Sequence, residues 1–232
     1  MFFVVTPDGA FIYAVKKIRV ALFVKKMKMQ RPGHFIALKN SIMRKLILFM
    51  HTSLDGFVAG PNGEMDWIIV DDDIFEYAGK RINESDTALY GRVTYQMMES
   101  YWPTAADQPE ATRHDKEHSK WYGAATKIVL SKSMRGKHLA NTIIISDALS
   151  ENINKLKEQP GKDIIVFGSP TAAHSLLKRD LIDGFWLFLN PILLGKGIPL
   201  FSDVESERKL GLLSSHVFSS GVVALHYACA RD

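Results

Sequence analysis

Three short turns in this 232-residue sequence combine glycine with cationic or hydroxyl side chains. Each turn directly follows an apolar run that is typical of a buried strand. The residues are Gly91, Arg92 and Thr94 in the first turn, Ser131 and Lys132 in the second, and Gly168, Ser169 and Thr171 in the third. Glycine lets a ligand approach the backbone, and the other side chains supply charge and donors for phosphate oxygens. One such turn alone is an ordinary strand-to-helix connection, but three at successive strand ends predict a site for a phosphate-rich dinucleotide.

Two standard phosphate-binding motifs are missing from the sequence. It contains no G-x-x-x-x-G-K-[ST], and Gly195-Lys196-Gly197 does not continue as G-x-G-x-x-G. Neither a P-loop nor a Rossmann fingerprint therefore explains the three turns.

The elements that must position these turns alternate along the chain. Apolar runs that predict strands cover residues 45–50, 87–90, 127–130, 142–145, 164–167 and 183–189. Amphipathic stretches that predict helices cover residues 71–82, 93–100, 147–157 and 171–178, with one more helix around Asp115. Residues 53–66 are expected to be a loop, Asp147 is the expected N-cap of its helix, and residues 210–218 and 222–230 are expected to form a hairpin.

Strands separated by helices predict an α/β fold with a largely parallel central sheet flanked by helices. The C-terminal hairpin adds an antiparallel edge to this sheet. Ligands of such sheets bind outside the carboxyl ends of the strands, which is where the three turns lie.

Charge divides the chain into two parts. The first 42 residues carry eight Lys or Arg and one Asp, a balance of +7, whereas the rest carry 21 basic and 24 acidic residues, a balance of −3. The pI of about 9.0 is thus a property of the first segment and predicts no nucleic-acid footprint on the main part. We expect residues 1–42 to be a basic, poorly ordered extension and residues 43–232 to form the domain.

Composition limits the compartment and the cofactor chemistry. No apolar run approaches the roughly 18 residues of a membrane span, so we expect no membrane segment. Cys229 is the sole cysteine, which excludes an internal disulfide and fits a reducing compartment, and we expect a cytoplasmic protein.

His114 and His118 could share one helix face, but a zinc site needs a third ligand. Their polar surroundings predict that both are exposed, and we expect no metal site.

Several stretches resemble the dihydrofolate-reductase-like family that includes the reductase domain of bacterial riboflavin biosynthesis. In order, they are Ser53-Leu54-Asp55-Gly56-Phe57-Val58-Ala59, Leu89-Tyr90-Gly91-Arg92-Val93-Thr94-Tyr95, Ile128-Val129-Leu130-Ser131-Lys132, Ile165-Val166-Phe167-Gly168-Ser169 and Asn190-Pro191-Ile192-Leu193-Leu194-Gly195-Lys196-Gly197-Ile198-Pro199-Leu200-Phe201. The resemblance extends from Met43 to Asp232, and the ordered set is far more specific than any one stretch.

The resemblance implies a dihydrofolate-reductase-like fold and an NADPH-dependent hydride transfer to a small heterocycle, such as an aminopyrimidine or a pterin. The first turn would then grip cofactor phosphates, and the second would lie near the adenosine 2′-phosphate. The third would line the pyrophosphate and the nicotinamide. The chain departs from the family in this third turn, because Ser169 and Pro170 follow Gly168 where a glycine pair is usual.

Hydride transfer requires little acid–base machinery, because the cofactor supplies the reducing equivalent. The acceptor still gains a proton, so Asp55 and Asp66 are candidate catalytic carboxylates. The loop of Asp55 faces substrate in relatives, although an Asp before Gly56 is also a common turn residue. Asp66 could equally be a surface acid. Trp67 and Trp102 are candidates for stacking on a substrate ring, although aromatic residues more often belong to the core.

Two further expectations follow from the resemblance. Relatives are often homodimers, and the apolar C-terminal hairpin would suit a self-complementary interface. The alternative to an enzyme is a non-catalytic nucleotide-binding or interaction protein that retains the fold, and the Gly168-Ser169-Pro170 departure favours it.

Overall fold

The computed structural model describes residues 43–202, 204 and 207–230, so the expected extension over residues 1–42 lies outside the described residues. The strands are β1 (Leu46–Ser53), β2 (Phe57–Ala59), β3 (Ser85–Gly91), β4 (Thr126–Leu130), β5 (Thr142–Ile145), β6 (Asp163–Phe167), β7 (Gly184–Asn190), β8 (Ile198–Pro199), β9 (Leu210–Val217) and β10 (Val223–Cys229). The helices are α1 (Asp72–Ile82), α2 (Arg92–Ala105), α3 (Arg113–Ala124), α4 (Leu149–Glu158) and α5 (Pro170–Leu177).

An eight-stranded sheet forms the centre of the described domain, in the order β5-β4-β3-β6-β1-β7-β10-β9. The six strands from β5 to β7 in this order pair in parallel. Strand β10 pairs antiparallel with β7 and with β9, so the C-terminal hairpin lies at one edge. The predicted α/β fold, with its largely parallel sheet and antiparallel hairpin, is confirmed.

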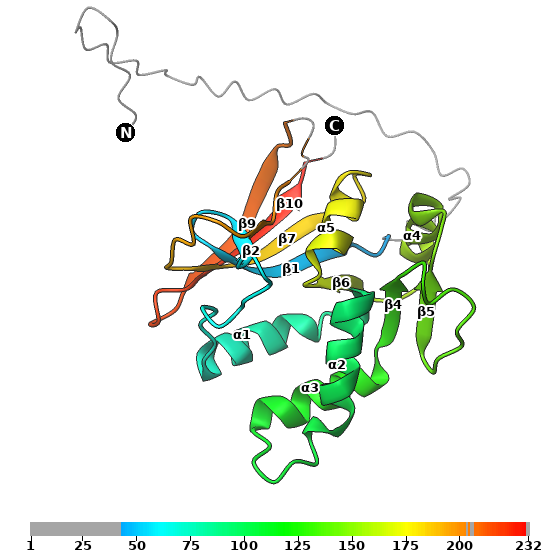
Figure 1. Cartoon of the computed structure of the whole chain (residues 1–232), viewed down its shortest axis with the longest axis horizontal. Helices are drawn as coiled ribbons and strands as arrows, with labels where there is room; N and C mark the ends of the chain where they lie inside the picture. The colour runs from blue at the N-terminus through cyan, green and yellow to red at the C-terminus, as the bar shows by residue number, and fades with distance from the viewer. Residues whose placement is uncertain (1–42, 203, 205–206, 231–232) are drawn as a thin grey trace, which may run out of the picture. The chain divides into compact units, whose positions relative to one another are not determined.

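Helices cover both faces of the sheet, as Figure 1 shows: α4 and α5 lie on one side, and α1, α2 and α3 lie on the other. A parallel sheet needs this arrangement because both of its faces are apolar. None of the described helices combines the length and the apolar character that crossing a bilayer requires.

Alternating side chains of the central strand β1 supply two separate cores. Leu46 and Leu48 are fully buried and pack in one cluster with Leu176 of α5. Phe49 belongs to the opposite cluster, together with Ile74 of α1. Each fully buried aliphatic side chain stabilises the fold by about 2 kcal/mol, so β1 is anchored from both sides.

Two local expectations from the sequence are wrong. Residues 53–66 are not all loop, because β2 pairs with β8, with Ala59 opposite Ile198. Asp147 does not cap α4. The N-cap position is held by Ala148, and the Asp147 carboxylate forms an ion pair with Arg135 instead.

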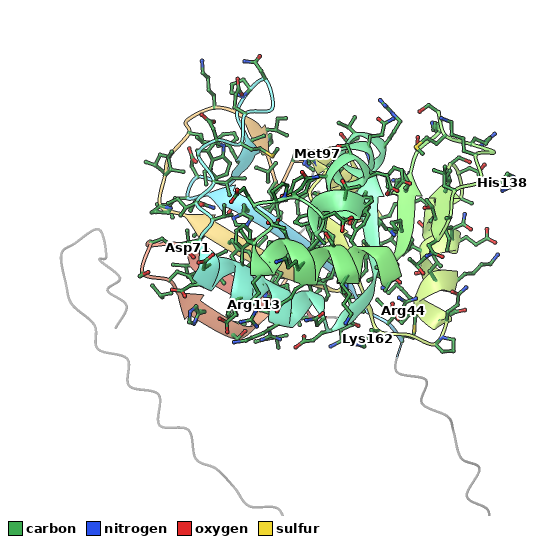
Figure 2. The ribbon with its side chains drawn as sticks, turned by 90° about the horizontal axis from the view of Figure 1, so that it is seen from below. Arg44, Asp71, Met97, Arg113, His138 and Lys162 are labelled. Carbon is green, nitrogen blue, oxygen red and sulfur yellow. The ribbon has the colours of Figure 1, made fainter. Side chains whose placement is uncertain are left out.

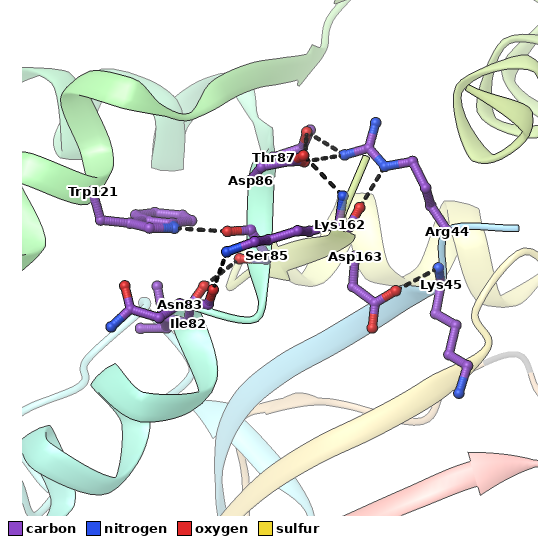
Figure 3. Close-up of polar contacts among 10 residues, drawn as sticks. All are labelled: Arg44, Lys45, Ile82, Asn83, Ser85, Asp86, Thr87, Trp121, Lys162 and Asp163. Atoms are coloured by element: carbon purple, nitrogen blue, oxygen red, sulfur yellow. Dashed lines mark hydrogen bonds and ion pairs between the residues drawn. The ribbon is translucent and has the colours of Figure 1, made fainter. Parts of the chain in front are cut away.

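A polar cluster closes the amino-terminal end of the sheet, opposite the predicted ligand edge (Figure 3). The Arg44 guanidinium is buried and contacts the carboxylate of Asp86, the hydroxyl of Thr87 and the carbonyl of Lys162. The Lys162 amide donates to the second Asp86 oxygen at 2.9 Å. Figure 2 shows Arg44 and Lys162 side by side, far from Met97 of α2. The cluster joins the starts of β1, β3 and β6 and leaves the carboxyl ends free for a site.

Candidate functional site

A cavity of about 790 Å³ opens at the carboxyl ends of β3, β4 and β5 and beside the start of α5. Seven of the eight residues of the three predicted turns line it, namely Gly91, Arg92, Thr94, Ser131, Lys132, Ser169 and Thr171. The lining also includes Ser146, Asp147, Ala148, Ser175 and Arg179. Gly168 does not line the cavity and instead precedes the lining residue Ser169. The tertiary structure thus brings the three turns to one cavity.

Three helices begin at this cavity, and none of the three is capped by a side chain. Their N-cap residues are Gly91 for α2, Ala148 for α4 and Ser169 for α5. The first amides of a helix have no partner within the helix, and they carry a partial positive charge. In contrast, α1 and α3 are capped by the side chains of Asp71 and Thr112, and neither cap lines the cavity. The uncapped amides therefore meet where an anionic ligand would lie.

Side-chain charge at the cavity has the same sign as these helix ends. Arg92, Lys132 and Arg179 are the cationic lining residues, and Asp147 is the acidic one. The Asp147 carboxylate is already paired with Arg135, whose Nε donates to Ser146 Oγ at 3.0 Å. The lining thus presents net positive charge, which attracts phosphate.

The third turn has the backbone conformation that glycine usually provides. Gly168 and Ser169 both lie in the left-handed region, with φ of 51° and 57°. Pro170 follows at the first turn of α5, where the missing amide hydrogen costs nothing. The Ser169 hydroxyl lies above Gly91, so that a Cβ on Gly91 would come closer than 3.0 Å to Ser169 Oγ. The Ser169 side chain therefore packs into the space that Gly91 leaves open.

Asp55 is exposed and holds a loop instead of lining the cavity. Its carboxylate accepts from Ser53 Oγ at 2.6 Å and from the amides of Gly195 at 2.8 Å and Leu194 at 3.2 Å. The bond from Ser53, together with those from Gly195 and Leu194, lowers the pKa of Asp55 below its usual value. A carboxyl group that remains ionised is a poor proton donor. In this structure Asp55 joins the turn after β1 to the loop before β8.

The other three predicted catalytic or substrate residues also do not line the cavity. Asp66 is exposed in the connection between β2 and α1. Trp67 is half-buried in the same connection, and its indole N–H donates to Glu64 O at 3.1 Å. Trp102 packs on α2, where its indole N–H contacts Met98 Sδ at 3.1 Å.

The expectation that His114 and His118 are exposed is wrong, because both are partly buried among aromatic rings. The His114 ring stacks on Phe75 at 4.0 Å, and the His118 ring lies 4.0 Å from Trp102. Burial lowers the pKa of His118 from 6.5 to about 3 and also lowers the pKa of His114. In the part of the chain that the structure describes, no group of three or more His, Cys, Asp or Glu side chains could hold a metal ion.

Sequence reasoning missed two polar residues at the carboxyl ends of β1 and β7. His51 lies opposite Phe188 in the register of these strands, and Ser53 lies opposite Asn190. Burial lowers the pKa of His51 from 6.5 to about 4. Asn190 is 1% exposed and bonds to three backbone groups. The sequence shows only a histidine and an asparagine near the ends of two apolar runs. This pattern also fits polar residues that are buried in the core without a functional role.

Comparison with protein families gives a match over most of the described domain. The family model described as the RibD C-terminal domain matches residues 44–224. The uncharacterized protein YyaP of Bacillus subtilis (strain 168) is 37% identical over 189 residues, which cover 81% of this chain and 96% of YyaP.

The solved structures that this chain resembles include a protein described in terms of riboflavin biosynthesis. A putative riboflavin biosynthesis protein from Shewanella sp. PV-4 is 25% identical, with a TM-score of 0.59 over 81% of this chain and 99% of that chain. Dihydrofolate reductase from Enterococcus faecalis is 12% identical, with a TM-score of 0.54 over 81% of this chain and 97% of that chain. The second likeness concerns the fold alone.

Proposed function

Because the chain belongs to the RibD C-terminal domain family, we propose that it is an NADPH-dependent reductase that transfers a hydride to a small heterocycle, such as an aminopyrimidine or a pterin. The observation that carries this proposal is the meeting of three uncapped helix N-termini, at Gly91, Ala148 and Ser169, around one cavity. A dinucleotide with several phosphates has the matching charge distribution. The cavity volume of about 790 Å³ lies within the usual range for cofactor sites.

The residues of the cavity fit separate parts of such a cofactor. The amides that begin α2 and α5 would hold the pyrophosphate, with Arg92 as the nearby cation. Ser131 and Lys132 would hold the adenosine 2′-phosphate, which is the group that distinguishes NADPH from NADH. The bound dinucleotide would supply the hydride, and the protein would orient it against the acceptor and exclude water.

Titration of the full chain with NADPH, followed by nicotinamide fluorescence, tests cofactor binding. The variant Arg92→Ala should bind NADPH roughly tenfold more weakly, since a charge-assisted hydrogen bond contributes about 1.5 to 3 kcal/mol. Lys80→Ala is the matched control, because Lys80 pairs with Glu76 on the surface of α1 and does not line the cavity. If the unaltered chain leaves NADPH fluorescence unchanged, the proposal is wrong.

Consumption of NADPH separates the enzyme from the non-catalytic alternative. A panel of pterins, aminopyrimidines and quinones should contain at least one acceptor that the chain reduces, seen as loss of absorbance of the reduced nicotinamide. Tight NADPH binding with no consumption across the panel would favour a nucleotide-binding protein that retains the fold.

We also propose that the protein acts as a homodimer in the cytoplasm. Strand β9 ends the sheet, and its outer edge has no partner strand among the described residues. Leu212, Leu213 and Val217 on this strand are 55%, 56% and 70% exposed. An exposed apolar edge strand favours pairing with another chain, and a twofold axis would bury both edges at once. The single cysteine fits a reducing compartment.

A further inference from the structure

The loop that follows β4 is tied to the start of α4 at the wall of the cavity. The Ser131 amide donates to the carbonyl of Ile145, the last residue of β5, at 3.0 Å, so the ends of β4 and β5 lie side by side. The Arg135 amide donates to the carbonyl of Lys132 at 3.3 Å, so the loop turns back on itself. The Arg135 side chain therefore reaches the two residues that follow β5.

Arg135 bonds to both of these residues. Its guanidinium forms an ion pair with the Asp147 carboxylate, and its Nε donates to Ser146 Oγ at 3.0 Å. Ser146 and Asp147 line the cavity, whereas Arg135 does not. The side chains of Arg135 and Asp147 are 65% and 66% exposed, and an ion pair this exposed contributes little to stability. The pair therefore matters for what the Asp147 carboxylate would do in the cavity without it.

Asp147 lies where a carboxylate would act against a phosphate. It is the acidic residue of a lining whose other charged residues are cationic, and it directly precedes the uncapped N-cap Ala148 of α4. It also follows Ile145 by two residues, and Ile145 is bonded to Ser131 of the turn that is proposed to hold the 2′-phosphate. In dinucleotide sites of other folds, a carboxylate that accepts from the ribose hydroxyls selects NADH, and an arginine accommodates the 2′-phosphate of NADPH.

We propose that Arg135 is a positioning residue that sets the coenzyme preference by holding the Asp147 carboxylate away from the ribose 2′ position. This inference rests on the proposed function and concerns the coenzyme selectivity of the same cavity. Without Arg135, the Asp147 carboxylate would repel a 2′-phosphate and would accept hydrogen bonds from the hydroxyls of an unphosphorylated ribose. Lys132 attracts the 2′-phosphate directly, whereas Arg135 removes a repulsion, so the two cations contribute in different ways.

Titrations of the full chain with NADPH and with NADH, followed by nicotinamide fluorescence, test this role. Arg135→Ala should bind NADPH about fivefold more weakly and NADH about twofold more tightly, because an exposed charge acts through screened electrostatics. Arg135→Lys should retain the preference for NADPH, since a lysine can still pair with Asp147. The double variant Arg135→Ala, Asp147→Asn should return both affinities to within about twofold of the unaltered chain, because no carboxylate is left to restrain.

Arg113→Ala is the matched control. Arg113 forms an equally exposed type of ion pair with Glu117 on α3, with Nε and Oε1 2.7 Å apart, and neither residue lines the cavity. This variant should bind both dinucleotides within about twofold of the unaltered chain, since the charge that it removes is outside the lining. Opposite changes for NADPH and NADH in Arg135→Ala are a result that a merely structural role of the ion pair would not produce.

Two results would overturn the role of Arg135. One is an equal loss of NADPH and NADH affinity in Arg135→Ala, and the other is a double variant that binds NADPH as weakly as Arg135→Ala. If the unaltered chain binds neither dinucleotide, the proposed function is wrong, and NMR titrations with adenosine 2′,5′-bisphosphate and 5′-AMP then decide the inference. Arg135→Ala should weaken binding of the bisphosphate only. Equal effects on the two fragments, or binding of neither fragment to the unaltered chain, would overturn the inference as well.

Discussion

The hydroxyl of Ser169 occupies the space in which a side chain at Gly91 would lie, because a Cβ at residue 91 would come closer than 3.0 Å to Ser169 Oγ. These two residues are the N-caps of α5 and α2, and both line the candidate cofactor cavity. The Ser169 side chain, in the turn after β6, can therefore take this position only because residue 91, in the turn after β3, is a glycine.

Gly91→Ala should lower both the free energy of unfolding and the affinity for NADPH. The added methyl group would displace the Ser169 side chain, at a cost of about 1 to 2 kcal/mol, because overpacking forces neighbours out of place. Adding Ser169→Gly to this variant should restore most of both losses. Chemical denaturation and NADPH titration of the two single variants and the double variant measure the coupling. Gly79→Ala on α1 is the control, since no atom lies within 4 Å of its Cβ position and helix propensity predicts a small gain. Equal losses in Gly91→Ala and the double variant would contradict the pairing.

Lys132→Ala should change the choice between NADPH and NADH. Removing the cation expected at the 2′-phosphate should weaken NADPH binding by roughly tenfold and leave NADH binding nearly unchanged. Fluorescence titrations with both dinucleotides measure the ratio. Lys155→Ala provides the comparison, because Lys155 pairs with Glu151 on the exposed side of α4. A similar loss for both dinucleotides would show that Lys132 acts through net charge and not through the 2′-phosphate.

Stability should fall as the pH drops from about 6.5 to 4. The folded state holds His51 and His118 neutral, with pKa values lowered from 6.5 to about 4 and about 3, whereas the unfolded chain binds protons at its ordinary pKa. Above pH 6.5 both states are neutral at these groups, so their contribution to stability is fully present. As the pH falls, only the unfolded state gains protons, and each histidine costs on the order of 3 kcal/mol by pH 4.

Denaturant unfolding at pH 7 and pH 4.5 measures this loss, with His118→Phe as the test variant. Because phenylalanine does not titrate, the free energy of unfolding of the variant should fall less between the two pH values than that of the unaltered chain. The same fall in both proteins would mean that His118 is not held neutral by burial.

Charges on the edge strand should separate a homodimer into monomers. Lysine on an exposed edge opposes strand pairing, so the double variant Leu212→Lys, Leu213→Lys should sediment as a monomer at micromolar concentration, where the unaltered chain is expected to be a dimer. Leu139→Lys is a suitable control because Leu139 is 39% exposed but lies far along the sheet, beside β5. If the unaltered chain is a monomer, the proposed homodimer is wrong. If the double variant stays dimeric, the interface does not lie at the edge of β9.

Local sequence patterns were sufficient for most elements of the fold. The apolar runs at residues 127–130 and 142–145 correspond to β4 and β5 because a parallel strand is buried on both faces and carries a continuous apolar signal. Strand β2 escaped detection, since three residues carry little periodicity and its partner β8 lies far along the chain. The expected N-cap of α4 was wrong because of another distant contact. Asp147 is a residue type that often caps helices, but its carboxylate forms an ion pair with Arg135.

By itself, the sequence determined the alternation of strands and helices and hence the edge of the sheet at which the three turns meet, because these depend on short-range periodicity and on the rule that ligands bind at the carboxyl ends of parallel strands. Only the tertiary structure decided that Asp55 holds a loop, that Trp102 packs on Met98 and that His51 stacks on Phe188. These roles depend on which distant group lies next to each side chain. The type of a residue does not predict these neighbours. An aspartate, a tryptophan or a histidine can stabilise a turn, pack in a core or contact a ligand.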